Sequence, residues 1–201
     1  MGAYSNFVQD FPNRCNSLLR DFEVAARYRG KEVTLMLAMA TSGLIIPFAR
    51  LQEAKHPSLD RRKFTDAVTM FDDLMSKRFL GSRLWPSNSA SWMIGNIDRG
   101  NQRIDVWSLE AKSKPLSNEE MTGNIIRQLR NALAHGNIFT LGDPISRIIF
   151  LSRPKLDGDQ FIFYMVSPVD FRQFLSNWFL VLETLNIPGE VPTAGELVSI
   201  A

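Results

Sequence analysis

The sequence predicts a mainly α protein: an antiparallel bundle of four to five helices with a small β-hairpin inserted before the last helix. Apolar residues recur at helical spacing over several separate stretches, and one pair of β-branched and aromatic segments lies near the C-terminal end. The 201 residues, 45% of them hydrophobic, are enough to bury one core. We therefore expect residues 1–201 to form a single domain with its core over about 13–186.

The first two helices are predicted from an apolar stripe and an uncharged run. Residues 13–29 carry the stripe, and Gly30 is placed to end it. Residues 33–49 contain no charge, but the run is shorter than the roughly 20 residues that a membrane span needs, and it includes Pro47. We expect a buried core helix and no membrane contact.

The middle of the chain has a helical pattern of apolar residues in its first part and no regular pattern in its second. Residues 61–81 keep helical spacing as far as Phe79, with Gly81 as the expected stop. Residues 82–115 mix Pro, Ser, Asn and Gly with short apolar pieces, which predicts an irregular excursion with one short helix. Three tryptophans in it indicate that it packs on the core: Trp85, Trp92 and Trp107.

A regular helical pattern begins again at Ser117. The spacing of Ser117 and Glu120 has the form of a capping box, so a helix is predicted from there to Gly136, a glycine suited to end it. The stretch RNALAHG (130–136) would then form the last turns of that helix.

The C-terminal part predicts a hairpin, a helix and a tail. Residues 145–153 and 160–166 are rich in β-branched and aromatic residues, and a turn at Asp157-Gly158 separates them. Ser167-Pro168 supplies a cap and a first-turn proline for the last helix. Residues 187–201 show no stripe and are expected to form a loose tail.

Composition excludes several classes of protein. The 23 Lys and Arg residues nearly balance 21 Asp and Glu, so nucleic-acid contact is permitted but not demanded. The single cysteine, Cys15, forms no internal disulfide, and the N-terminus lacks a secretory pattern, so a cytoplasmic location is expected. The phosphate-binding, zinc-hydrolase and CxxC motifs are absent, and we expect no cofactor and no metal.

Two arginine–histidine pairs have similar spacing. Arg130 precedes His135 by five positions, with the polar Asn131 directly after the arginine, and Arg50 precedes His56 by six. His56 is followed by proline at a helix-to-loop break, which favours a structural role for the Arg50 pair. His135 instead ends a predicted amphipathic helix, and this context distinguishes it.

The arrangement of Arg130 and His135 resembles the HEPN superfamily, whose signature is Arg-polar-x3–5-His near the end of a helix in a helical bundle. Arg130, Asn131 and His135 occupy the three positions. The following hairpin and long final helix are similar to the small HEPN proteins of plasmids and defence loci. The likeness extends over about 13–186 and is weak over 82–115.

The resemblance implies a metal-independent endoribonuclease that works as a homodimer in a toxin–antitoxin, antiphage defence or RNA-processing setting. RNA is the expected substrate, and an antitoxin or another defence protein is an expected partner. The chemistry agrees, because histidine transfers protons near neutral pH and an arginine fork suits phosphate oxygens. Two copies of His135 would share the acid and base roles, Arg130 would stabilise the transition state, and Asn131 would orient the histidine or the phosphate.

Other interpretations stay open at this point. Arg130 and His135 are also suited to the negative end of a helix dipole, and Asn131 could be an ordinary exposed residue. Arg127, one turn earlier, could extend an RNA-binding surface or be simply solvated. The second interpretation, after the ribonuclease, is a catalytically silent HEPN-like module that binds RNA or protein, and the third is a structural dimerisation module.

Overall fold

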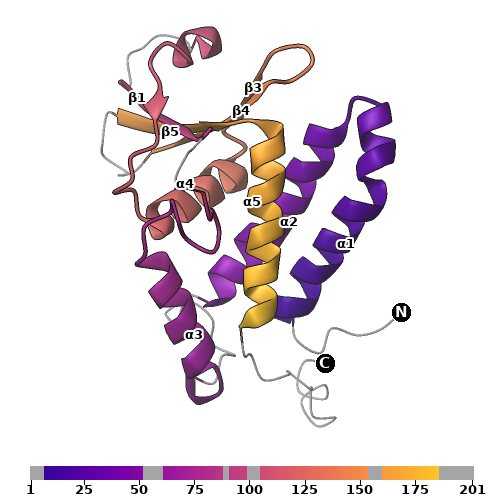
Figure 1. The fold of residues 1–201 in the computed structure, drawn as a ribbon, viewed down its shortest axis with the longest axis vertical. Helices are drawn as coiled ribbons and strands as arrows, with labels where there is room; N and C mark the ends of the chain where they lie inside the picture. The colour runs from indigo at the N-terminus through magenta and orange to yellow at the C-terminus, as the bar shows by residue number, and fades with distance from the viewer. Residues whose placement is uncertain (1–6, 52–60, 88–90, 99–104, 154–159, 186–201) are drawn as a thin grey trace, which may run out of the picture.

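The structure, a computed structural model, describes residues 7–51, 61–87, 91–98, 105–153 and 160–185 (Figure 1). Within them lie the helices α1 (Phe7–Tyr28), α2 (Glu32–Leu51), α3 (Arg61–Met75), α4 (Thr122–His135) and α5 (Pro168–Thr184), and the 3-10 helix η1 (Val106–Leu109). The strands are β1 (Met93–Asp98), β2 (Lys114–Pro115), β3 (Ile138–Leu141), β4 (Arg147–Ser152) and β5 (Gln160–Val166). The prediction of a mainly α protein is confirmed, but the structure also contains a sheet.

Helices α1, α2 and α5 pack together on one side of the molecule (Figure 1). Gly30 forms the turn between α1 and α2 with a φ of 62°, a left-handed conformation that glycine adopts without strain. Helices α2 and α5 approach closely at Gly43, where a Cβ atom would lie 2.5 Å from the Phe179 ring. The indole Nε1 of Trp178 donates a buried hydrogen bond to the Gly43 carbonyl at 2.9 Å. This contact fixes α5 against the middle of α2.

Helix α2 is long and apolar enough, by length and composition, to cross a membrane. In the fold it contacts α1, α3, α4 and α5. Its buried residues recur along most of its length: Val33, Met36, Ala40, Gly43, Leu44, Pro47, Phe48 and Leu51. This packing supports the interpretation of α2 as a core helix.

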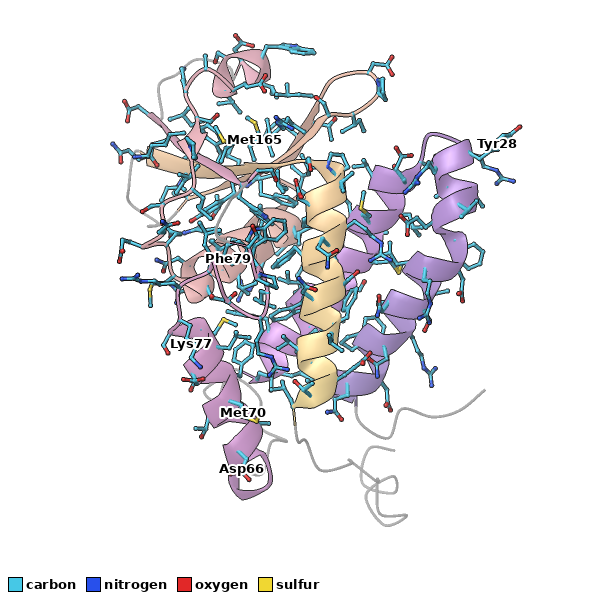
Figure 2. All side chains as sticks on the ribbon, in the orientation of Figure 1. Tyr28, Asp66, Met70, Lys77, Phe79 and Met165 are labelled. Atoms are coloured by element: carbon cyan, nitrogen blue, oxygen red, sulfur yellow. The ribbon has the colours of Figure 1, made fainter. Side chains whose placement is uncertain are left out.

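The predicted hairpin exists as the antiparallel pair β4–β5, and it forms the centre of a larger sheet. The five strands have the order β2-β1-β5-β4-β3, and all neighbours are antiparallel. Alternate residues of β4 enter two different clusters: Ile148 and Phe150 face the main core, and Ile149 and Leu151 face a second, smaller one. Both faces of the central strands are therefore buried, and Figure 2 shows side chains on both sides of the sheet, with Met165 of β5 on the side of the smaller cluster. The expected turn at Asp157-Gly158 lies outside the described residues.

The prediction of an irregular segment over 82–115 was wrong in part. The short helix is present as η1, but β1 and β2 add two strands to the sheet. Strand β1 contains Gly95, where a Cβ atom would lie 2.3 Å from Cζ of Phe163 on the neighbouring strand. The glycine thus makes room for the phenylalanine ring, and it weakens the sequence signal for a strand.

The predicted ends of two helices were also wrong, for one shared reason. Helix α3 ends at Met75, because the next residues pair with the segment before α4: the Phe79 amide donates to the Glu120 carbonyl at 2.8 Å. Helix α4 begins at Thr122, and no capping box forms. The Ser117 hydroxyl accepts from the Glu119 amide at 3.2 Å, and the Glu120 carboxylate accepts from the Tyr164 hydroxyl at 3.2 Å. A third boundary also differs: α1 begins at Phe7, six residues before the predicted start at residue 13.

Candidate active site on helix α4

Helix α4 ends where its sequence predicts. Gly136 has a φ of 67°, in the left-handed region, and its amide donates back to Leu133 at 3.3 Å. The Asn137 amide donates to the Ala132 carbonyl at 2.9 Å, which completes a Schellman motif. His135 is therefore the last helical residue.

One face of α4 is buried and the other is open to solvent. The buried face packs on α2 and β4 and consists of Ile125, Ile126, Gln128, Leu129, Ala132 and Leu133. On the open face Arg127, Ala134 and His135 are exposed, while Arg130 and Asn131 are half-buried. The helix contains two arginines and no acidic residue. The predicted site residues thus share one positively charged surface.

The Arg130 side chain is held by two neighbours. Its guanidinium carbon lies 5.7 Å from the centre of the Phe48 ring on α2, within the range of a cation–π contact. Its Nη1 donates to Oδ1 of Asn131 at 2.9 Å. Its Nε is buried and has no hydrogen-bond partner. The arginine head is therefore fixed in direction by the Phe48 ring and by Asn131.

Phe48 is a residue that the sequence did not reveal as part of the site. It is 3% exposed, and its ring meets Phe71 edge-on with centroids 5.8 Å apart. Phe71 in turn meets Trp178 edge-on at 6.3 Å. A row of aromatic rings thus connects Arg130 to α5. No sequence signal could have found it, because Phe48 lies on another helix far along the chain.

His135 lies at the opposite edge of the open face. On a regular helix five positions turn through about 140°, so Arg130 and His135 lie on the two edges of the open face of α4. Asn131 lies between them, one turn before His135 and bonded to Arg130. Arg127 lies one turn before Asn131. The structure therefore brings Arg130 and Asn131 together, and leaves His135 separate within one chain.

The end of α4 is anchored to the sheet. The buried Ser152 hydroxyl on β4 bonds the Gln128 side chain, and the Leu151 amide donates to the Asn137 carbonyl at 3.0 Å. These contacts fix the backbone on both sides of His135. The imidazole itself remains exposed to solvent.

In the other arginine–histidine pair, Arg50 lies in the last turn of α2, and His56 lies outside the described residues. Among the described residues, no group of three or more His, Cys, Asp or Glu side chains is arranged to hold a metal ion.

Comparison with known families agrees with the motif and its position. Residues 1–188 match the sequence model of a family described as HEPN pEK499 p136. The chain belongs to this HEPN family. No curated protein and no solved structure matches the chain. Membership of the family fits a nuclease or a HEPN-like module.

Proposed function

We propose that this HEPN protein is a metal-independent endoribonuclease whose active site is formed by two copies of helix α4. The observation that carries the proposal is that the open face of α4 presents Arg130, Asn131 and a single histidine, His135. Within one chain that histidine cannot serve as both base and acid in the same step. A second copy of the helix supplies the missing group.

Twofold symmetry makes this arrangement simple. Consider an axis that lies between two facing copies of α4, parallel to their exposed faces and perpendicular to the line from Arg130 to His135. Rotation about it exchanges the two ends of that line, so that the His135 of a second copy faces Arg130 of the first. The levels of Arg130 and His135 are about 7.5 Å apart along the helix. The small Ala134 side chain on this face permits close approach of the second helix.

The chemistry follows from the groups that meet there. One imidazole takes the proton of the RNA 2′-hydroxyl as that oxygen attacks the adjacent phosphorus. The second imidazole gives a proton to the leaving 5′-oxygen, which produces a 2′,3′-cyclic phosphate and a free 5′-hydroxyl. Arg130 contributes its free guanidinium donors to the negative charge that develops on the phosphorane oxygens. Asn131 holds Arg130 in place, and Arg127 binds a neighbouring phosphate.

The test is cleavage of labelled RNA in the presence of EDTA. The parent protein is expected to cut and to leave 2′,3′-cyclic phosphate ends, whereas Arg130→Ala and His135→Ala lose cutting. Arg83→Ala serves as the matched control, because this exposed arginine bonds Thr184 on α5 and is not part of the proposed site. Cleavage that EDTA abolishes, or equal cutting by all variants, would contradict the proposal. A folded protein that binds RNA through this face but never cuts it would instead be a catalytically silent HEPN module.

A further inference from the structure

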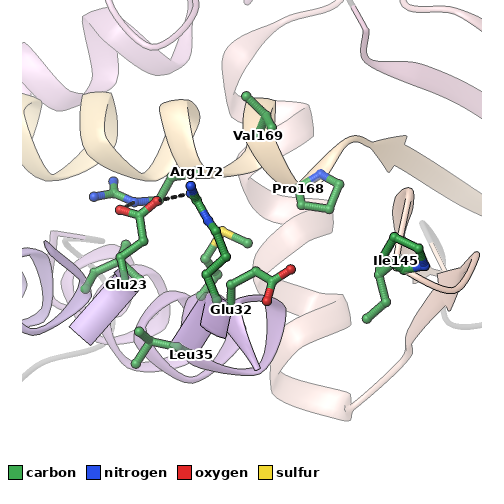
Figure 3. Close-up of a pocket in the computed structure, with 11 residues that line it drawn as sticks. Glu23, Glu32, Leu35, Ile145, Pro168, Val169 and Arg172 are labelled. Carbon is green, nitrogen blue, oxygen red and sulfur yellow. Dashed lines mark hydrogen bonds and ion pairs between the residues drawn. The ribbon is translucent and has the colours of Figure 1, made fainter. Parts of the chain in front are cut away.

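A hollow lies between α1, the start of α2, the β3–β4 loop and the start of α5 (Figure 3). It has a volume of about 410 Å³, which is within the usual size of a small-ligand site. Its walls are mainly aliphatic: Leu19, Leu35, Met36, Pro144, Ile145 and Pro168. The consecutive helices α1 and α2, the β3–β4 loop and the start of α5 thus enclose one apolar cavity. It does not include any of the proposed catalytic residues.

Most of the charged groups at this cavity are already paired. Glu23 accepts from Arg27 Nη2 at 2.9 Å and from Arg172 Nε at 3.3 Å. Arg172 also bonds the Ser176 hydroxyl. These three charged side chains form a pair network along one wall, and Figure 3 shows Glu23 at its centre.

Glu32 differs from them. Its Oε2 is buried and has no hydrogen-bond partner. Its carboxylate points away from the Glu23 network and toward the side of the cavity where Ile145 lies (Figure 3). Glu32 is the first residue of α2, where the helix dipole favours a negative charge, but the dipole does not satisfy the oxygen. A buried acceptor without a donor is costly, and Glu32 lines the cavity, so a cation bound there would lie beside an uncompensated carboxylate.

We propose that this cavity binds an aliphatic cation, an alkylammonium or alkylguanidinium group, with Glu32 as its counter-ion. The cation pairs with the Glu32 carboxylate, and its hydrocarbon stem lies against the aliphatic walls. A flat aromatic ligand would find no aromatic ring among the lining residues on which to stack. An anion would meet arginines that Glu23 already occupies. The same group occurs in free amines and in Lys or Arg side chains of other proteins.

The first experiment compares ligands by saturation-transfer NMR titration of the full chain. The probes are n-butylammonium and n-butylguanidinium, with 1-butanol as a neutral probe of similar size. Hydrogen bonds to charged groups predict that the cations bind roughly ten- to a hundredfold more tightly than the alcohol. Glu32→Gln should remove that advantage, while Glu183→Gln, at an exposed position on α5, should leave it unchanged.

A second variant guards against a folding effect of Glu32→Gln. Val169 lines the cavity and is 77% exposed, so Val169→Trp is tolerated at the surface and narrows the opening without altering the carboxylate. It should also weaken cation binding. Spermidine and a capped Gly-Arg-Gly peptide then distinguish the two sources, since the tighter of them identifies a free amine or a protein side chain. Absence of cation binding, equal binding of the alcohol, or unchanged affinity in both variants would overturn the proposal.

Discussion

Phe48 is expected to hold the Arg130 side chain in its direction, and replacement of Phe48 tests that role. Phe48→Leu keeps an apolar side chain in a site that is 3% exposed, but it removes the ring on which Arg130 lies. The same change removes the edge-on contact with Phe71. The arginine would then keep only its bond to Asn131 and would lose its fixed direction.

Two contributions give the expected magnitude. An aromatic pair contributes about 0.5–1.5 kcal/mol beyond its buried area. A cation–π contact at a partly exposed site contributes about 0.5–1 kcal/mol. Together they predict a loss of about 1–2.5 kcal/mol in the free energy of unfolding, with a further decrease from the smaller side chain. Of these two contributions, only the cation–π contact involves Arg130 of the proposed site.

A double-mutant cycle separates the cation–π contribution from that of the aromatic pair. Urea unfolding is measured for the parent, Phe48→Leu, Arg130→Met and the double variant, and the coupling energy is expected to be about 0.5–1 kcal/mol. The same cycle with Phe71→Leu is the matched control, because Phe71 belongs to the same row of rings but touches Phe48 rather than Arg130. A coupling of zero for Phe48, or an equal coupling for Phe71, would refute the role of the ring as a support for Arg130.

Three further outcomes are expected. Gly136→Ala should cost about 1–2 kcal/mol of stability and reduce RNA cleavage, because its φ of 67° strains any residue with a Cβ, although no atom lies within 4 Å to clash. Gly136→Asn should cost less, since asparagine tolerates this conformation, and equal unfolding midpoints of the two variants would argue against strain. Burial raises the pKa of the Cys15 thiol from 9.0 to about 11. The folded state therefore holds its proton longer than the unfolded chain, and about 2–3 kcal/mol of stability should be lost as pH rises from 9 to 11. Urea unfolding at pH 8 and pH 11 should show a smaller loss for Cys15→Ala, and identical losses would contradict this. Finally, if the ribonuclease is a toxin, expression should arrest bacterial growth and His135→Ala should relieve the arrest; equal arrest by both would exclude this site as its cause.

Features that depend on neighbouring residues in the chain could be predicted from the sequence. Gly136 ends α4 because a glycine in the left-handed conformation satisfies the last carbonyls. Ser167 caps α5 by accepting from the Asp170 amide at 3.1 Å, with proline in the first turn. The position of the motif at the end of a helix followed from the same local rules.

Features that depend on contacts with residues distant in the chain could not be predicted from the sequence. Glycine and asparagine in β1 weaken the strand signal, and Gly95 is explained only by the Phe163 ring on β5. The pattern at Ser117 met every local requirement of a capping box, yet pairing of Phe79 with Glu120 prevents it. Phe48 gave no sign of its contact with Arg130, because that contact exists only once α2 and α4 pack together.

The central claim, that two chains build one active site, is tested most directly by mixing subunits. A fixed amount of parent protein is allowed to exchange with a threefold excess of His135→Ala, and RNA cleavage is then measured in EDTA. If each centre needs both histidines, random pairing leaves active only dimers of two parent chains, and activity should fall to about one quarter. An excess of Arg83→Ala should cause no such fall. Activity that stays constant after complete exchange with His135→Ala would show that each chain acts alone, and would contradict the shared site.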